Sequence, residues 1–329
     1  MKILHITPHL GGGVGTVICD WMGRDEKQGY HIIASLDTIN PKASKQLYEE
    51  GVVGVHCMGL QKNYHILDWL ICESDIIIVH YWDHPMLADL LSRPLPDCRM
   101  VFWCHKNIPY SQSELSYPDV WIDTSPIQGH GKYIWSTGDI SRFLEIKKAA
   151  HKGFNIGTVV SPKLHPRFRD MCEEIKKRIP DARFTCLGDH NEKTVYPEYF
   201  KFTGKVDDVA PYLAEMDVFF YPLRGDHYGT GEQVLGESMA AGVVPVVMDN
   251  PCERSIISNF YDGYIAHDTN QAINHIISFL LKTNYGREVV GARARNSAIN
   301  LYSLDTMVFQ WNDVFDSMMS KTKSERRVL

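Results

Sequence analysis

The sequence predicts two α/β domains in tandem, each built on a parallel β-sheet. Its 329 residues suffice for two domains at ~100–200 residues each. Short, almost wholly apolar runs alternate with longer amphipathic segments, as expected for strands buried on both faces and linked by helices. The alternation starts again after a charged stretch at Glu145–Lys152. We therefore expect one domain over residues 1–150, a second over 151–304 and a cleft between them.

The first half begins with the apolar strand Lys2–Thr7, followed by a glycine loop. Its strongest strand is Asp75–Trp82, which contains the run Ile-Ile-Ile-Val. Further strands are expected at Tyr30–Leu36, Val55–Gly59, Arg99–His105 and Val120–Thr124, and helices at Thr16–Gln28, Pro41–Glu50, His65–Glu73 and Pro85–Ser92.

The second half repeats this order from the strand Asn155–Val160. The helix Pro166–Arg178 is expected to stop before Pro180, because proline cannot continue a helix. Later strands are expected at Arg183–Gly188, Asp217–Tyr221, Val244–Asp249 and Tyr264–Ala266, and helices at Val209–Glu215, Gly231–Ala241, Asn270–Leu281, Arg287–Leu301 and Asp305–Met319. The charged tail Lys321–Leu329 is expected to be frayed.

Composition excludes several classes of protein. The 34 basic and 40 acidic side chains give a net charge of -6, which argues against a nucleic-acid partner held by a basic face. The eight cysteines form no C-x-x-C pair, which favours a reducing compartment. No apolar run approaches the ~20 residues that span a bilayer. We expect a cytoplasmic protein, and peripheral contact with the inner face of a membrane stays open.

A glycine-rich loop, Gly11–Gly15, follows the first strand and opens a helix. Free backbone N–H groups point at whatever binds there. A dinucleotide fingerprint is a weak alternative: Thr16 replaces its last glycine, although Asp37 could hold a ribose. Three successive glycines exceed the needs of a turn, so we expect Gly12 and Gly13 to approach a ligand.

A second glycine-rich loop precedes a helix in Tyr221–Val247, which carries two carboxylates. Glu232 falls in the first turn, where it offsets the helix dipole. Glu237 lies between Leu235 and Met239 on a face that should be packed, so its carboxylate requires a partner. Vicinal sugar hydroxyls would serve, because a carboxylate accepts two hydrogen bonds at once.

Several stretches together resemble the retaining family-4-type glycosyltransferases of the GT-B fold, glycosyl transferases group 1. The segment from Glu237, E-S-M-A-A-G-V-V-P-V, matches the family signature E-(A/S)-M-A-x-G-x-P-V with one extra valine. Weaker matches are F-T-G-K-V-D-D-V from Phe202, D-V-F-F-Y-P from Asp217 and S-T-G-D-I-S-R-F from Ser136. The resemblance implies two Rossmann-like domains, with the helix over residues 305–320 packing back on the first.

The resemblance also implies a nucleoside-diphosphate-sugar donor on the second domain, a saccharide or lipid-linked acceptor on the first, and no cofactor. Glu237 matches the family glutamate that holds the donor ribose. Gly229 stands where the family has its other glutamate, so we expect Glu232, or amides of Gly229–Gly231 that include Thr230, to replace it. Lys163 matches the lysine that neutralises the diphosphate. Further donor contacts are expected from Ser161, Arg167, Lys205 and Val206.

His105 ends an apolar strand of the first domain, where the family has a histidine beside the reacting sugar; His80 is a weaker candidate. Lys163, His105 and Glu232 are the predicted catalytic residues. We find neither a D-x-D pair nor a metal-ligand spacing, which predicts metal-independent transfer. A sugar-nucleotide epimerase of the same fold and a catalytically degenerate nucleotide-sugar-binding scaffold remain alternatives, and an oxidoreductase is a more distant one.

Overall fold

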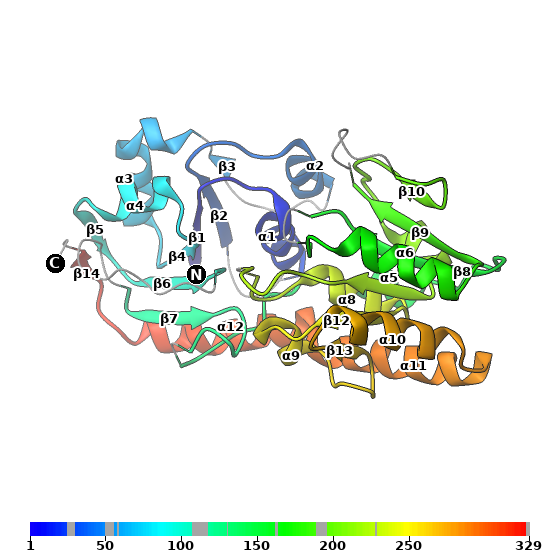
Figure 1. The fold of residues 1–329 in the computed structure, drawn as a ribbon. Coiled ribbons are helices and arrows are strands. Elements are labelled where there is room, and N and C mark those ends of the chain that lie inside the picture. The colour runs from blue at the N-terminus through cyan, green and yellow to red at the C-terminus, as the bar shows by residue number, and fades with distance from the viewer. Residues whose placement is uncertain are drawn as a thin grey trace. The chain divides into compact units, whose positions relative to one another are not determined.

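The computed structural model of the protein describes residues 1–24, 30–49, 56–57, 59–106, 118–129, 131–161, 164–188, 196–227 and 229–326. The chain divides into two compact units. Unit 1 comprises Met1–Asp139, Tyr228–Gly231 and Leu304–Leu329; unit 2 comprises Ile140–His227 and Glu232–Ser303. Each contains a six-stranded parallel sheet, which confirms the predicted fold class of two α/β units (Figure 1).

The sheet of unit 1 has the strand order β3-β2-β1-β4-β6-β7. Its strands are β1 (Lys2–Thr7), β2 (Tyr30–Ser35), β3 (His56–Cys57), β4 (Ile76–Tyr81), β6 (Met100–Cys104) and β7 (Val120–Asp123). The helices of this unit are α1 (Gly12–Arg24), α2 (Pro41–Glu49), the short 3-10 helix η1 (Leu60–Lys62), α3 (Tyr64–Glu73), α4 (Pro85–Leu91) and α12 (Leu304–Met319).

Side-chain alternation along these strands builds a hydrophobic core on each face of the sheet. Leu4 and Ile6 of β1 join the cluster that includes residues of α3 and α4. Ile3 points to the opposite face, where its cluster includes Trp21 of α1 and Trp311 of α12. The Trp21 and Trp311 rings stack with their centroids 4.9 Å apart. The last helix is therefore part of the core of unit 1.

A small antiparallel pair corrects the expectation of a frayed tail for residues 324–326. Strand β14 (Ser324–Arg326) pairs with β5 (Leu95–Cys98). The segment Leu95–Cys98 contains proline and aspartate, which are depleted in strands, so its sequence does not predict a strand. Backbone pairing with a segment more than 200 residues away orders both.

The sheet of unit 2 has the order β10-β9-β8-β11-β12-β13. Its strands are β8 (Phe154–Val159), β9 (Ala182–Leu187), β10 (Phe200–Phe202), β11 (Val218–Tyr221), β12 (Val244–Met248) and β13 (Tyr264–Ala266). The helices are α5 (Ser141–Leu144), α6 (Phe168–Arg178), α7 (Ala210–Glu215), α8 (Gln233–Ala240), α9 (Pro251–Ile256), α10 (Thr269–Leu280) and α11 (Asn284–Leu301). One core of this unit joins α6 and α10 to the sheet.

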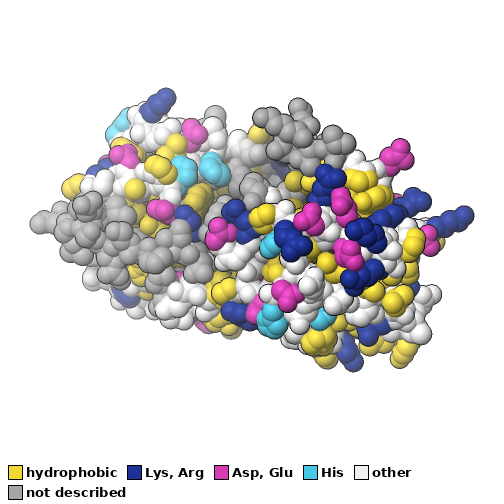
Figure 2. All heavy atoms as spheres, viewed as in Figure 1, with side chains coloured by type: hydrophobic (Ala, Val, Ile, Leu, Met, Phe, Trp, Pro, Cys, Tyr) yellow, Lys and Arg dark blue, Asp and Glu magenta, His cyan; other side chains and the backbone are white. Residues whose placement is uncertain are grey.

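Acidic and basic side chains are interspersed over the part of unit 2 visible in Figure 2. Among the residues described above, no helix combines the length and the hydropathy that crossing a membrane requires.

Candidate functional site

In each unit the strands are parallel, so their C-terminal ends meet at one edge, where α/β sheets commonly bind ligands. At this edge of unit 2 the loops after β8 and β11 are joined. The His165 N–H donates to the Pro222 carbonyl over 2.8 Å. Leu164 forms an antiparallel bridge with Leu223. These bonds fix the start of the loop that leads to α8.

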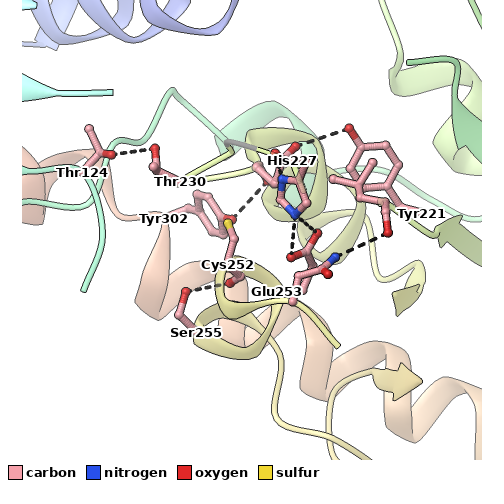
Figure 3. Close-up of polar contacts among 11 residues, drawn as sticks. Thr124, Tyr221, His227, Thr230, Cys252, Glu253, Ser255 and Tyr302 are labelled. Atoms are coloured by element: carbon pink, nitrogen blue, oxygen red, sulfur yellow. Dashed lines mark hydrogen bonds and ion pairs between the residues drawn. The ribbon is translucent and has the colours of Figure 1, made fainter. Parts of the chain in front are cut away.

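A buried cluster of four side chains lies at the C-terminal end of β11, and we call Tyr221, His227, Glu232 and Glu253 the acid–histidine cluster. Figure 3 labels three of them, Tyr221, His227 and Glu253. His227 Nε2 lies 3.1 Å from Glu253 Oε1, and His227 Nδ1 lies 3.9 Å from Glu232 Oε1. The Tyr221 hydroxyl donates to Glu232 Oε2 over 3.3 Å. The side chains of His227, Glu232 and Glu253 are 2%, 8% and 0% exposed. The tyrosine and histidine thus supply donors to two buried carboxylates.

Burial and the neighbouring Glu232 carboxylate raise the pKa of Tyr221, so its hydroxyl keeps its proton. Ser161, a predicted donor-binding residue, is hydrogen-bonded to the same hydroxyl. The structure therefore brings Ser161 and Glu232 to one tyrosine from loops after two adjacent strands. Glu232 points into this cluster.

Tyr302 contacts the start of helix α8 at two points, Glu232 before the helix and Gly236 in its first turn. The Tyr302 hydroxyl donates to the Glu232 carbonyl over 3.2 Å. A Cβ atom at Gly236 would lie 2.8 Å from the Tyr302 ring, so this close approach requires glycine. Leu235 and Met239 are fully buried, whereas Glu237 is half-buried. Glu237 is therefore carried on a fixed helix, one turn beyond Glu232.

The residues before α8 belong to unit 1. Thr124 donates to Thr230 over 2.8 Å, and both side chains are buried. A Cβ at Gly231 would lie 3.7 Å from the Ser136 carbonyl oxygen. The segment with Gly229, Thr230 and Gly231 therefore groups with unit 1, between two parts of the chain that group with unit 2.

The other predicted donor contacts lie apart from the acid–histidine cluster. Arg167 is the N-cap residue of α6 and interacts with Asp170 and Thr269. Lys205 and Val206 follow β10, two strands from β8 in the sheet. Lys163 lies outside the described residues.

At the corresponding edge of unit 1, Gly12 and Gly13 form the first turn of α1, which begins four residues earlier than predicted. Gly12 has φ 61°, a left-handed conformation that favours glycine. His105 follows β6, and its Nε2 lies 3.1 Å from Nδ1 of His80. The two predicted histidines are therefore hydrogen-bonded to each other.

Sequence reasoning missed His227 and Glu253. His227 lies in the second glycine-rich loop, but no role was assigned to its side chain, and helix α9, which carries Glu253, was not predicted. A signal was available, since Pro251 directly follows a buried strand and proline favours the first position of a helix. Within the described ranges, no group of three or more His, Cys, Asp and Glu side chains could hold a metal ion.

Comparisons with known proteins agree on the fold. Residues 153–282 match the family model of glycosyl transferases group 1. No curated protein sequence matches the chain.

Solved glycosyltransferase structures match nearly the whole length. Anabaena Alr3699/HepE in complex with UDP-glucose matches with TM-score 0.73 and 16% identity, over 96% of this chain and 100% of that one. A glycosyltransferase from Rickettsia africae matches with TM-score 0.73 and 13% identity, over 98% and 99% of the two chains. Sucrose-phosphate synthase from Thermosynechococcus elongatus matches with TM-score 0.67 and 13% identity, over 97% and 99%. The chain thus has the fold of GT-B glycosyltransferases, and its unit 2 carries the match to glycosyl transferases group 1.

Proposed function

We propose that this protein is a glycosyltransferase that moves a sugar from a nucleoside diphosphate to a hydroxyl of a saccharide or lipid-linked acceptor, with retention and without a metal. The observation that carries this proposal is the match of residues 153–282 to glycosyl transferases group 1. That segment contains β8, β11 and α8, whose ends meet around Ser161, Tyr221 and Glu232.

Unit 2 would bind the donor. Glu237, half-buried on α8, would accept hydrogen bonds from both ribose hydroxyls. Lys163 would neutralise the diphosphate as it departs, and such preorganised charge is commonly the largest catalytic term. A uracil nucleotide is the first donor to test, because the HepE structure holds UDP-glucose.

Unit 1 would bind the acceptor, with His105 beside the reacting sugar. A neutral imidazole can exchange hydrogen bonds with hydroxyls but does not offset a diphosphate charge. We also propose that the protein works in the cytoplasm, in glycan or glycoconjugate biosynthesis. Among the seven cysteines for which the structure describes a side chain, none forms a disulfide, which agrees with a reducing compartment.

Calorimetric titration of UDP, GDP and ADP into four proteins tests the donor site. The wild type should bind one of them. Glu237→Gln should lower the affinity for that nucleotide by about 10- to 150-fold, which corresponds to the ~1.5–3 kcal/mol of a hydrogen bond to a charged acceptor. Glu288→Gln, an equal loss of charge at an exposed position of α11, should bind as the wild type does. His105→Ala should also keep its affinity. Equal binding by the Glu237 and Glu288 variants would refute the role of Glu237.

A further inference from the structure

Four histidines of unit 1 form a continuous row of hydrogen bonds that the proposed donor chemistry does not use. His5 Nε2 lies 2.8 Å from His31 Nδ1, and His5 Nδ1 lies 3.0 Å from His80 Nε2. His80 Nδ1 lies 3.1 Å from His105 Nε2. We call His31, His5, His80 and His105 the histidine row. It crosses from β2 through β1 and β4 to the residue after β6.

The row follows from strand register. His5 is opposite Ile33 of β2 and Ile78 of β4, so His31 and His80 each lie two positions away, on the same face. His80 is opposite Trp103, and His105 is again two positions further along. Each step is a diagonal neighbour on the face covered by α1 and α12.

Aromatic rings enclose the row on that face. Trp21 packs edge-on against His5 and His31, with ring centroids 5.0 and 5.6 Å apart. Trp103 contacts His80 and His105 at 5.6 and 4.8 Å. His5 and His80 are fully buried, and His31 is 3% exposed. Water therefore does not supply the hydrogen bonds of the inner rings.

The connectivity restricts where the protons are. A neutral imidazole has one donor nitrogen and one acceptor nitrogen. Every contact in the row joins Nδ1 of one ring to Nε2 of the next, so three satisfied hydrogen bonds require all four rings to be the same tautomer. Either every ring carries its proton on Nδ1, or every ring carries it on Nε2.

This rule holds while the rings are neutral, because an imidazolium would donate from both nitrogens. Desolvation lowers the pKa of His5 and His80 well below its ordinary value and that of His105 to about 3. Among the described residues, the titratable groups whose electrostatic interactions influence the pKa values of His5 and His80 are other histidines of the row, and these interactions also disfavour protonation. His5, His80 and His105 are therefore uncharged near neutral pH.

We propose that the histidine row is a coupled tautomer switch, in which His31, His5 and His80 position the proton of His105. In the Nδ1-protonated state His105 presents a donor at Nδ1; in the Nε2-protonated state it presents an acceptor there. Conversion moves one proton along each of the three hydrogen bonds. One proton enters at one end of the row and one leaves at the other, so the net charge is unchanged.

The coupling itself does not depend on the proposed function, whereas its use in catalysis does. If His105 contacts sugar or acceptor hydroxyls, the state of the row decides whether it accepts from them or donates to them. His31, His5 and His80 would then be positioning residues that act through His105.

Long-range ¹H–¹⁵N spectra of full-length protein labelled at the histidine rings test the coupling directly. Among the signals of the 15 histidines of the wild type, the four from the row should belong to a single tautomer class, and those of His5, His80 and His105 should show neutral rings between pH 6.5 and 8. Single substitutions assign the signals. Mixed tautomer classes within the row, or a charged His5, His80 or His105 in that range, would overturn the proposal.

Breaking the row gives the second test. His80→Phe, with His31→Leu as a milder change at the far end, should shift the ¹⁵N signals of the remaining row histidines; His275→Phe, at a buried histidine of unit 2, should leave them unchanged. Unaltered row signals in a folded His80→Phe or His31→Leu protein would contradict the coupling. The spectra could agree with the coupling while both substitutions leave the transfer rate and its pH profile unchanged. That result would overturn only the proposed positioning role of the row. No transfer by the wild type would instead refute the proposed function.

Discussion

Glu253 shows how one side chain can hold a loop that carries functional groups. Its carboxylate is wholly buried and pairs with His227, which in turn lies near Glu232. Glu232 immediately precedes α8. Glu253 therefore contributes, through His227 and Glu232, to fixing the start of the helix that carries Glu237. Glu253, for which no contact with substrate is predicted, thus helps to position Glu237, for which such a contact is predicted.

Glu253→Ala should lower the free energy of unfolding of unit 2 by about 2–5 kcal/mol, because His227 would lose its buried charged partner. Urea unfolding followed by far-ultraviolet circular dichroism measures this. All seven tryptophans lie in unit 1, so their fluorescence reports that unit and should change little. Glu288→Ala, exposed on α11, is the control. If the Glu253 variant were as stable as the Glu288 variant, the His227–Glu253 pair would not stabilise unit 2.

The motifs identified from sequence were those with local signatures: the glycine loops, Glu237 within its signature and the histidine after an apolar strand. His227 and Glu253 escaped because their partnership joins residues 26 positions apart through the fold. The hydrogen bonds of His5 with His31 and His80 escaped for the same reason, because they join different strands of the sheet. Only the strand register reveals that row.

At the scale of the element, the central sheet of unit 1 should be sensitive to acid. His5, His80 and His105 are neutral in the folded state, with pKa values below those of the unfolded chain, which takes up three protons below about pH 6.5. The unfolded state then binds more protons, so stability falls as the pH falls, by about 4 kcal/mol per pH unit below pH 5.5.

Tryptophan-detected urea unfolding at pH 7.0, 6.0 and 5.0 isolates this effect. His80→Phe removes one of the three groups, so its stability should fall less steeply with acid than that of the wild type, by about 1.4 kcal/mol per pH unit. Identical slopes for the two proteins would mean that His80 is protonated in the folded state.

Helix α12 provides a matched pair of aromatic residues. Trp311 is fully buried against Trp21, whereas Phe309 is 66% exposed. Trp311→Ala should cost unit 1 about 3–5 kcal/mol, and Phe309→Ala less than 0.5 kcal/mol. Tryptophan fluorescence in urea measures both, since six other tryptophans remain. Similar losses for the two variants would show that α12 contributes little to the core.

For the whole molecule, alternating apolar runs were enough to predict two parallel α/β units. Strands that are buried on both faces require almost wholly apolar sequences, and such runs are easily recognised. Short elements escaped prediction. Strand β10 has three residues, and β5 becomes a strand only through its pairing with β14. The grouping of residues 229–231 with unit 1 was also beyond the sequence, since contacts such as Thr124–Thr230 join residues 106 positions apart.

The central claim, sugar transfer from a nucleoside diphosphate, is tested most directly by the release of nucleoside diphosphate from its sugar, measured with and without acceptors. Chromatography of wild type and Glu237→Gln, each with UDP-glucose and a panel of saccharide acceptors, follows the nucleotide and the sugar together. We predict release that rises with a suitable acceptor, equals the glycoside formed and nearly vanishes in the variant. Conversion of the sugar nucleotide without acceptor would identify an epimerase, and nucleotide binding with no turnover of any sugar nucleotide would identify a binding protein; either result would contradict the account.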